Sequence, residues 1–230
     1  MTGSAAASAI VITGASEQDR SASLAPIQNQ TKDPGMTSVM LRMRAATNAI
    51  HEKFDSQLCI ARSDAGQQDY LDFICLMWGW LVPFENLLWN QEWPEDMHAG
   101  ERNGKVDWLM RDIIACSEQG EVIHPRRSNA VPDMSTLAKR FGVAYVIEGA
   151  QMGGQVLRKT LGSRLSPGQF RWLQGYGEQT GARWTAFRKS AEQHLVAEHD
   201  MAEAAASACL TFASLEQWFQ HAGMLDHTKK

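Results

Sequence analysis

Apolar residues recur at steps of three and four along almost the whole chain from Thr37 onward. This spacing predicts amphipathic α-helices, and no segment shows the convincing every-second-residue alternation that is typical of a half-buried strand. The first helix is expected to begin at Thr37 or Ser38, either of which can cap it, and to run to about Arg62. One face of this helix is predicted to carry Leu41, Arg44, Asn48, His51, Asp55 and Leu58.

Breaks in the pattern divide the rest of the domain into further helices. A long apolar segment covers residues 64–90, and Pro83 is expected to kink it or split it in two. Turn-forming residues predict a loop over 117–132 and another break over 175–181. Further helices are expected over 106–115, over 135–165, from the cap Ser166-Pro167 to the break at 175, and over 182–197 and 198–221. The pattern therefore predicts an all-α single domain of about eight helices over residues 37–222.

The two ends of the chain do not share this pattern. Residues 1–36 are rich in Ala, Ser, Thr, Gln and Gly, and contain no aromatic residue. No Lys or Arg precedes their short apolar patch, whereas a signal peptide begins with a basic region. We expect residues 1–36 to form a disordered leader and residues 223–230 to form a disordered tail.

The composition is that of an ordinary globular protein, with 44% hydrophobic and 21% charged residues. A net charge of −4 and a pI of about 6.0 argue against a general nucleic-acid partner. No apolar run reaches the roughly 18 residues that a membrane span needs, so no membrane partner is expected. The four cysteines are widely spaced and form no CxxC motif, which argues against a zinc ribbon or a disulfide framework. They favour a reducing compartment, and we expect a cytoplasmic protein.

Three glycines, Gly149, Gly153 and Gly154, stand close together in the helix that is expected over 135–165. Each glycine destabilises a helix by roughly 1 kcal/mol relative to alanine. A helix with this much lost propensity normally has something pressed against its bare backbone. A second helix and a large flat ligand would both satisfy that condition.

His51 lies on the first predicted helix, four residues before Asp55. A neutral imidazole is a good iron ligand, and a carboxylate one turn further on can orient it through its other ring nitrogen. A surface histidine with an acidic neighbour at this spacing is, however, also common. The other six histidines lie in loop-like sequence, near helix ends, or at a spacing that does not stack them on one face. We therefore interpret His51 and the glycine-rich helix as the two sides of a haem site.

Several segments carry motifs that are specific enough to compare with a known family. YVIEGAQMGGQVLRK at 145–159 has a Gly followed, after three residues, by Gly-Gly, and LRMRAATNAIHEKFD at 41–55 carries the histidine with its carboxylate. These two segments resemble the distal and proximal helices of haem oxygenases. Further likenesses to that family lie at WGWLVPFENLL (78–88), WLMRDIIACS (108–117), ARWTAFRKSAEQH (182–194) and AAASACLTFASLEQWF (204–219). The resemblance looks strongest to the bacterial branch that accompanies bacteriophytochromes.

This resemblance implies a haem-oxygenase-like fold and the oxidative cleavage of haem to biliverdin, CO and ferrous iron with O2. It implies haem b as substrate and cofactor, His51 as the axial iron ligand, and the three glycines Gly149, Gly153 and Gly154 as distal contacts. Electrons would come from an external ferredoxin or reductase, because the chain has no flavin, nicotinamide or iron–sulfur motif. The bacterial branch adds a bacteriophytochrome as one candidate acceptor of the biliverdin.

Two positions depart from the family pattern. Asp55 stands where a Glu is typical, and Ala150 stands where the animal-type motif has an Asp that organises distal water. The proton relay is therefore unassigned, with Gln151, Gln155 and ordered water as candidates. A haem carrier or sensor without turnover stays open as the alternative function, as does a scaffold without cofactor in which the glycines serve only helix packing.

A haem site also needs partners for the two propionates. Arg44 lies two turns before His51 on the predicted face, and Tyr145 is a candidate hydrogen-bond donor on the glycine-rich helix. The penultimate helix offers three further candidates, Arg183, Arg188 and Lys189. Each of these cations is alternatively a solvated surface charge.

Overall fold

The computed structural model describes residues 38–117, 122–161, 164 and 170–225. The predicted leader and the last residues of the predicted tail lie outside these ranges. The α-helices are α1 (Ser38–Gln57), α2 (Gln67–Leu81), α3 (Glu85–Trp89), α4 (Lys105–Cys116), α5 (Leu137–Leu161), α6 (Arg171–Gln174), α7 (Thr180–His194) and α8 (Glu198–His221). Short 3-10 helices are η1 (Cys59–Ala61), η2 (Glu95–Met97), η3 (Ala99–Glu101) and η4 (Gly177–Gln179). The all-α prediction is confirmed, since the described residues contain no β-strand.

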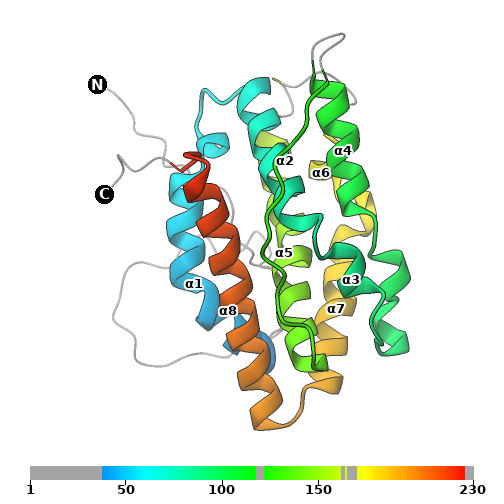
Figure 1. Ribbon diagram of the computed structural model, residues 1–230. Coiled ribbons are helices and arrows are strands. Elements are labelled where there is room, and N and C mark those ends of the chain that lie inside the picture. The colour runs from blue at the N-terminus through cyan, green and yellow to red at the C-terminus, as the bar shows by residue number, and fades with distance from the viewer. Residues whose placement is uncertain (1–37, 118–121, 162–163, 165–169, 226–230) are drawn as a thin grey trace.

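The glycine-rich helix α5 runs through the middle of the helical bundle, with α1 and α8 on one side and α4, α6 and α7 on the other (Figure 1). Helix α8 packs against both α1 and α5, so it joins the two helices that carry the predicted site. On the other side, α6 and α7 pack against α5, and α4 packs against α2 and α6. No helix among the described residues is both long and apolar enough to cross a membrane.

Close packing between α5 and α8 depends on Gly142, a glycine outside the predicted trio. A Cβ atom at Gly142 would lie 2.4 Å from the carbonyl oxygen of Ala204 and 2.7 Å from Cβ of Ser207. No side chain fits at such distances, so Gly142 is the position where a bare backbone meets a second helix. Gly142, the fourth glycine of α5, therefore has a helix-packing role of the kind that stays open for the trio.

Helix α2 ends at Leu81 and α3 begins at Glu85, so the long apolar segment is split at Pro83 as predicted. The predicted loop is an extended segment, residues 122–134, which we call the strap; it descends across the bundle beside α2 (Figure 1). The amide of Ser128 donates to the carbonyl of Gly79 at 2.9 Å. A Cβ atom at Gly79 would lie 2.1 Å from the carbonyl oxygen of Arg126, so the strap can lie against α2 only at a glycine.

Helix α1 buries a face that is rotated from the predicted one. Its buried residues are Val39, Met40, Met43, Thr47 and Phe54, while His51 and Asp55 are half-buried. Asn48, which belongs to the predicted face, is exposed and donates to Glu52 at 2.9 Å. Apolar contact decides the rotation, since the Met and Phe side chains bury more apolar surface than the polar residues of the predicted set.

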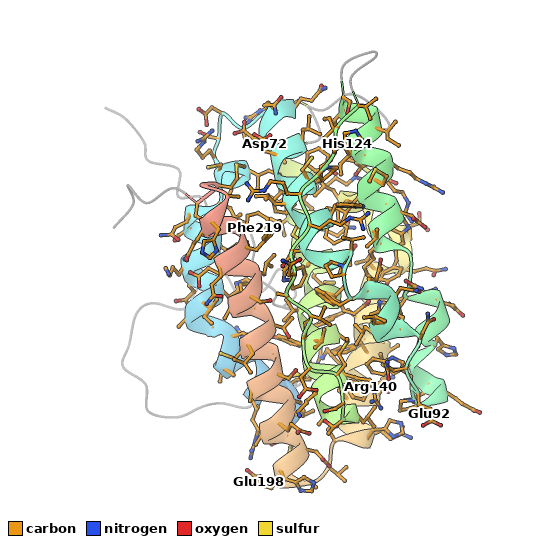
Figure 2. All side chains as sticks on the ribbon, viewed as in Figure 1. Asp72, Glu92, His124, Arg140, Glu198 and Phe219 are labelled. Carbon is orange, nitrogen blue, oxygen red and sulfur yellow. The ribbon has the colours of Figure 1, made fainter. Side chains whose placement is uncertain are left out.

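The C-terminal part of the bundle is held by Phe219, which is fully buried. Its side chain points from α8 into the interior between α1 and α2 (Figure 2), with ring centroids 5.2 Å from Phe54 and 5.8 Å from Phe73. The chain continues in the fold as far as Leu225, which is buried and forms a β-bridge with Leu58. The first residues of the predicted tail therefore pack against the end of α1.

Candidate functional site

A cavity lies between α1 and α5, the two helices that the sequence singled out. Helix α1 lines it with His51, Phe54 and Asp55, and Leu58, the residue after α1, lines it as well. Helix α5 lines it with Val146, Ala150, Gly153, Gly154 and Leu157. Two segments about a hundred residues apart in the chain therefore face each other across one cavity, because α8 packs on both.

His51 has one ring nitrogen satisfied and one unsatisfied. Its Nδ1 lies 3.0 Å from Oδ2 of Asp55, one helical turn further on. Its Nε2 is buried and has no hydrogen-bond partner among the described residues. The ring is held by Phe212 of α8, with centroids 5.3 Å apart. Because nearly all buried polar atoms have a partner, a buried nitrogen without one in a cavity wall indicates a ligand-binding atom.

Asp55 is half-buried beside His51, and burial raises the pKa of its carboxyl to about 6, although the hydrogen bond with His51 opposes this rise. At neutral pH the carboxylate is therefore mostly ionised and acts as the acceptor. An ionised Asp55 selects the tautomer of His51 that carries its proton on Nδ1. The Nε2 lone pair is then free to coordinate a metal.

The opposite wall of the cavity is built from backbone and small side chains. Gly153 and Gly154 line it, together with Ala150. Gly149 is buried in the same helix, but it is not among the lining residues. A Cβ atom at Gly154 would lie 3.5 Å from Cα and 3.6 Å from the carbonyl oxygen of Leu173, which is ordinary contact. Gly154 therefore meets both the cavity and the backbone of α6.

The predicted propionate partners do not line the cavity. Tyr145 is 3% exposed and packs on Trp184 with ring centroids 5.8 Å apart. Burial raises the pKa of Tyr145, while a hydrogen bond with Thr47 and the charge of Arg44 oppose the rise. These contacts place Tyr145, Thr47 and Arg44 together where α1 and α5 approach, next to the lining residue Val146.

The three cations on α7 have different surroundings. Arg183 pairs with Glu101 at 2.6 Å, and its guanidinium lies 4.8 Å from the ring centroid of Tyr176. Arg188 is half-buried, whereas Lys189 is exposed. Arg183 is thus engaged by Glu101 and Tyr176, and Arg188 is the more buried of the other two cations.

Five further lining residues were not predicted, because no local pattern marks them: Phe73, Met77, Trp172, Phe212 and Leu215. Trp172 belongs to the very short helix α6. Its amide donates to Oδ2 of the fully buried Asp112 at 2.8 Å, and the Tyr70 hydroxyl donates to the same oxygen at 2.6 Å. Asp112 lies in the segment WLMRDIIACS, so that motif has a structural role here, namely to hold α6 against the cavity.

The cavity is narrow in this conformation. Only about 40 Å³ of it is open to water-sized groups, whereas pockets for drug-sized ligands measure roughly 300–1,000 Å³. The lining is apolar except for His51 and Asp55. A large, flat, mostly apolar ligand with one metal coordination position matches this lining, and it needs α1 and α5 to move apart.

Comparison with known proteins agrees with this geometry. The sequence model of the family described as "Heme oxygenase" matches residues 37–221, a span that includes all eight α-helices of the structure. A curated relative named "Heme oxygenase", from Xanthomonas campestris pv. campestris (strain 8004), is 32% identical over 128 residues, which cover 50% of this chain and 77% of the relative. No solved structure matches the chain significantly. The chain therefore belongs to the haem oxygenase family, the enzymes that degrade haem with O2 and electrons from a reductase.

Proposed function

We propose that this haem oxygenase binds its substrate, haem b, in the cavity between α1 and α5, with Nε2 of His51 as the ligand of the iron. The observation that carries this proposal is the buried Nε2 atom, which lines the cavity and lacks a partner among the described residues. Haem supplies the iron centre at which O2 is activated and the porphyrin that is cleaved.

Asp55 orients the ligand. Its carboxylate accepts a hydrogen bond from Nδ1 of His51 at 3.0 Å, which holds the ring in the orientation and tautomer that present Nε2. The carboxylate is one methylene shorter than the Glu typical of the family, yet it reaches the ring directly. The departure noted in the sequence therefore leaves the positioning role intact.

The wall of the cavity opposite His51, which we call the distal wall, has no polar side chain from Ala150, Gly153 or Gly154. Ala150, Gly153 and Gly154 present a methyl group and bare backbone, so no acidic or basic side chain of these residues faces the iron position. A wall of this kind leaves room for O2 bent toward the porphyrin edge and for ordered water.

Proton delivery falls to ordered water because both candidate glutamines point elsewhere. Gln155 donates to the carbonyls of Leu173 and Gln174 at 3.3 and 2.8 Å. Gln151 is buried near Gly175, on a side of α5 that does not line the cavity. Ordered water that bridges the protein and bound haem is then the remaining candidate for proton delivery.

Arg44 and Arg188 are the proposed partners of the propionates. The charge of Arg44 acts on Tyr145, which precedes the lining residue Val146, and α7, which carries Arg188, packs against α1. Arg183 is less suited to this role because it already pairs with Glu101. Propionates that leave the cavity at this end would meet charge rather than apolar surface.

The wider setting follows from the family. We propose biliverdin, CO and ferrous iron as products, a ferredoxin or reductase as the separate electron donor, and a bacteriophytochrome as a candidate acceptor of the biliverdin. The four cysteines, Cys59, Cys75, Cys116 and Cys209, are all free thiols, which supports the proposal of a cytoplasmic location.

Haemin titration of the wild type and of His51→Ala tests the ligand assignment. The alanine variant is expected to lose the histidine-ligated absorption spectrum while it keeps its helix content, because His51 lines a cavity rather than the core. Added imidazole is expected to restore the spectrum. His199→Ala, at an exposed histidine of α8, is the matched control. An unchanged spectrum and unassisted turnover by His51→Ala would exclude His51 as the ligand.

A further inference from the structure

The face of α5 that points away from the cavity carries a buried ionic cluster. At its centre is Glu148, whose side chain is 1% exposed and which directly precedes Gly149. One carboxylate oxygen accepts from Nη1 of Arg102 at 2.7 Å, and the other lies 3.0 Å from Nζ of Lys105. The hydroxyl of Tyr176 donates to that second oxygen at 2.8 Å. Glu148 thereby connects α5 to α4, to the segment before it, and to the turn after α6.

Glu148, Arg102 and Lys105 are all buried, and the single carboxylate faces two cations. Lys105 is fully buried, donates to the Tyr176 hydroxyl at 2.7 Å and also donates to the carbonyl of Arg102. Its ammonium lies 5.0 to 5.8 Å from the ring centroids of Trp89, Trp108 and Tyr176. Burial alone would raise the pKa of Glu148, but Lys105 and Arg102 lower it, so the carboxylate is ionised. A fully satisfied buried network of this kind holds its members in one arrangement.

A second polar contact of α5, which like the Glu148 cluster we call a tie, lies at the C-terminal end of residues 149–154, the glycine span. Nε2 of Gln155 donates to the carbonyls of Leu173 and Gln174 at 3.3 and 2.8 Å. Glu148 and Gln155 therefore bracket Gly149–Gly154, and both hold α5 against residues 173–176.

Residues 173–176 are themselves firmly placed. The preceding turn is held by Asp112, which accepts from the amides of Arg171 and Trp172 at 2.7 and 2.8 Å. The chain then turns at Gly175, where φ is +55°, a conformation that side-chain-bearing residues rarely adopt. Asp112 of α4 thus helps to hold residues 173–176 from outside α5.

The cavity-facing side of α5 has no such means of support. Gly153, Gly154 and Ala150 offer no polar side chain, and each glycine weakens the helix by roughly 1 kcal/mol relative to alanine. Polar contacts that set the position of this wall therefore act from the opposite face of the helix.

We propose that Glu148 and Gln155 are positioning residues that clamp the glycine span at both ends and so set its distance from His51. This proposal rests on the proposed function, in which haem lies between that span and His51. Neither residue lines the cavity, so both act through the backbone that they hold.

Hydrogen–deuterium exchange of the apoprotein tests the clamp directly. In Glu148→Gln the amides of residues 149–154 are expected to exchange about 10-fold faster than in the wild type, because local opening becomes easier. Glu85→Gln is the matched control: Glu85 is 2% exposed and near the same cluster, but its carboxylate accepts from the α4 amides of Lys105 and Val106 instead of holding α5. Unchanged exchange in Glu148→Gln, or equal acceleration in Glu85→Gln, would overturn the clamp.

Gln155→Ala provides a second, milder variant, since Gln155 is only partly buried and the fold tolerates its loss more easily. The backbone amides of Gly153 and Gly154 are expected to exchange faster than in the wild type. Unchanged exchange of these amides would show that the hydrogen bonds of Gln155 do not restrain the helix there.

Two measurements with haemin connect the clamp to the site. Glu148→Gln is expected to bind haemin several-fold more weakly and to shift the pH midpoint of the ferric absorption spectrum, whereas Glu85→Gln shifts neither. A normal affinity and midpoint, despite faster exchange, would mean that the clamp does not set the distal wall. Exchange is measured without haem, so failure of the His51 assignment and failure of the clamp give different results.

Discussion

Oδ2 of Asp55 lies 3.0 Å from Nδ1 of His51, one helical turn earlier, while Nε2 of the same ring is buried without a partner among the described residues. Of the two ring nitrogens of His51, Nδ1 therefore has a hydrogen-bond partner and Nε2 has none among the described residues. The carboxylate fixes both the orientation and the tautomer of the ring, which is the arrangement expected of the iron ligand proposed above.

Asp55→Asn is expected to weaken haemin binding about 10-fold, within the range found when the partner of a metal-ligating histidine is removed. The amide is neutral and no longer favours the Nδ1 proton, so Nε2 becomes a poorer donor to iron. Haemin titration measures the change. Glu52→Gln, at an exposed neighbour that bonds only to Asn48 in the same helix, serves as the control. Equal affinities of the two variants would argue that Asp55 is a bystander.

Gly153→Leu is expected to prevent haemin binding while circular dichroism shows nearly unchanged helix content. Gly153 lines the cavity, and a leucine side chain would occupy the space between α5 and His51. Val156→Leu, on the exposed side of the same helix, is expected to bind haemin normally. Normal turnover by Gly153→Leu would place the distal wall elsewhere.

Alanine substitutions at two other glycines of α5 are expected to change stability in opposite directions. At Gly142 a Cβ atom would lie 2.4 Å from the Ala204 carbonyl, so Gly142→Ala is expected to destabilise by about 1–3 kcal/mol through overpacking. At Gly154 the nearest atom would be 3.5 Å away, so Gly154→Ala is expected to stabilise by about 0.4–1 kcal/mol. Thermal or urea unfolding measures the change in the free energy of unfolding of each variant relative to the wild type. The same sign for both would show that packing against α8 does not explain Gly142.

Lys105→Met is expected to destabilise the apoprotein by about 3–5 kcal/mol, because it leaves the buried Glu148 without its ammonium partner. The double variant with Glu148→Gln is expected to lose clearly less than the sum of the two single losses, since it removes both charges together. Urea unfolding of the four proteins completes the cycle. Strict additivity would mean that Lys105 and Glu148 do not stabilise each other.

Ala150→Asp addresses proton delivery. Ala150 lines the cavity, so the new carboxylate would enter the space where water is proposed to carry protons. The wild type is expected to form biliverdin with ascorbate or a ferredoxin system, and the variant is expected to match it or to fall below it by rearranging that water. Absorption spectra that follow loss of the Soret band measure both. A wild type that keeps its haem unchanged, together with a variant that forms biliverdin, would contradict the water relay.

Local properties of the sequence determined much of this protein. The three-and-four spacing of apolar residues predicts the helices, and Pro83 divides α2 from α3 because it lacks an amide proton and fixes its own φ. The pairing of His51 with Asp55 follows from helical geometry alone, since residues four apart lie on the same face. Such features are readable in advance because each depends on a few neighbouring residues.

Tertiary packing decided the rest. Gly142 and Gly154 are both glycines within one helix, yet one faces the backbone of α8 and the other faces the cavity and α6. The sequence makes Tyr145 a candidate hydrogen-bond donor to a propionate, but its side chain is buried against Trp184 and Thr47 and does not line the cavity. The partners of Glu148 come from positions 102, 105 and 176. Sequence alone determined which helices form and which faces are amphipathic. Only the packing of distant helices decided what each buried face meets, because those contacts depend on helix rotation and on side chains far away in the chain.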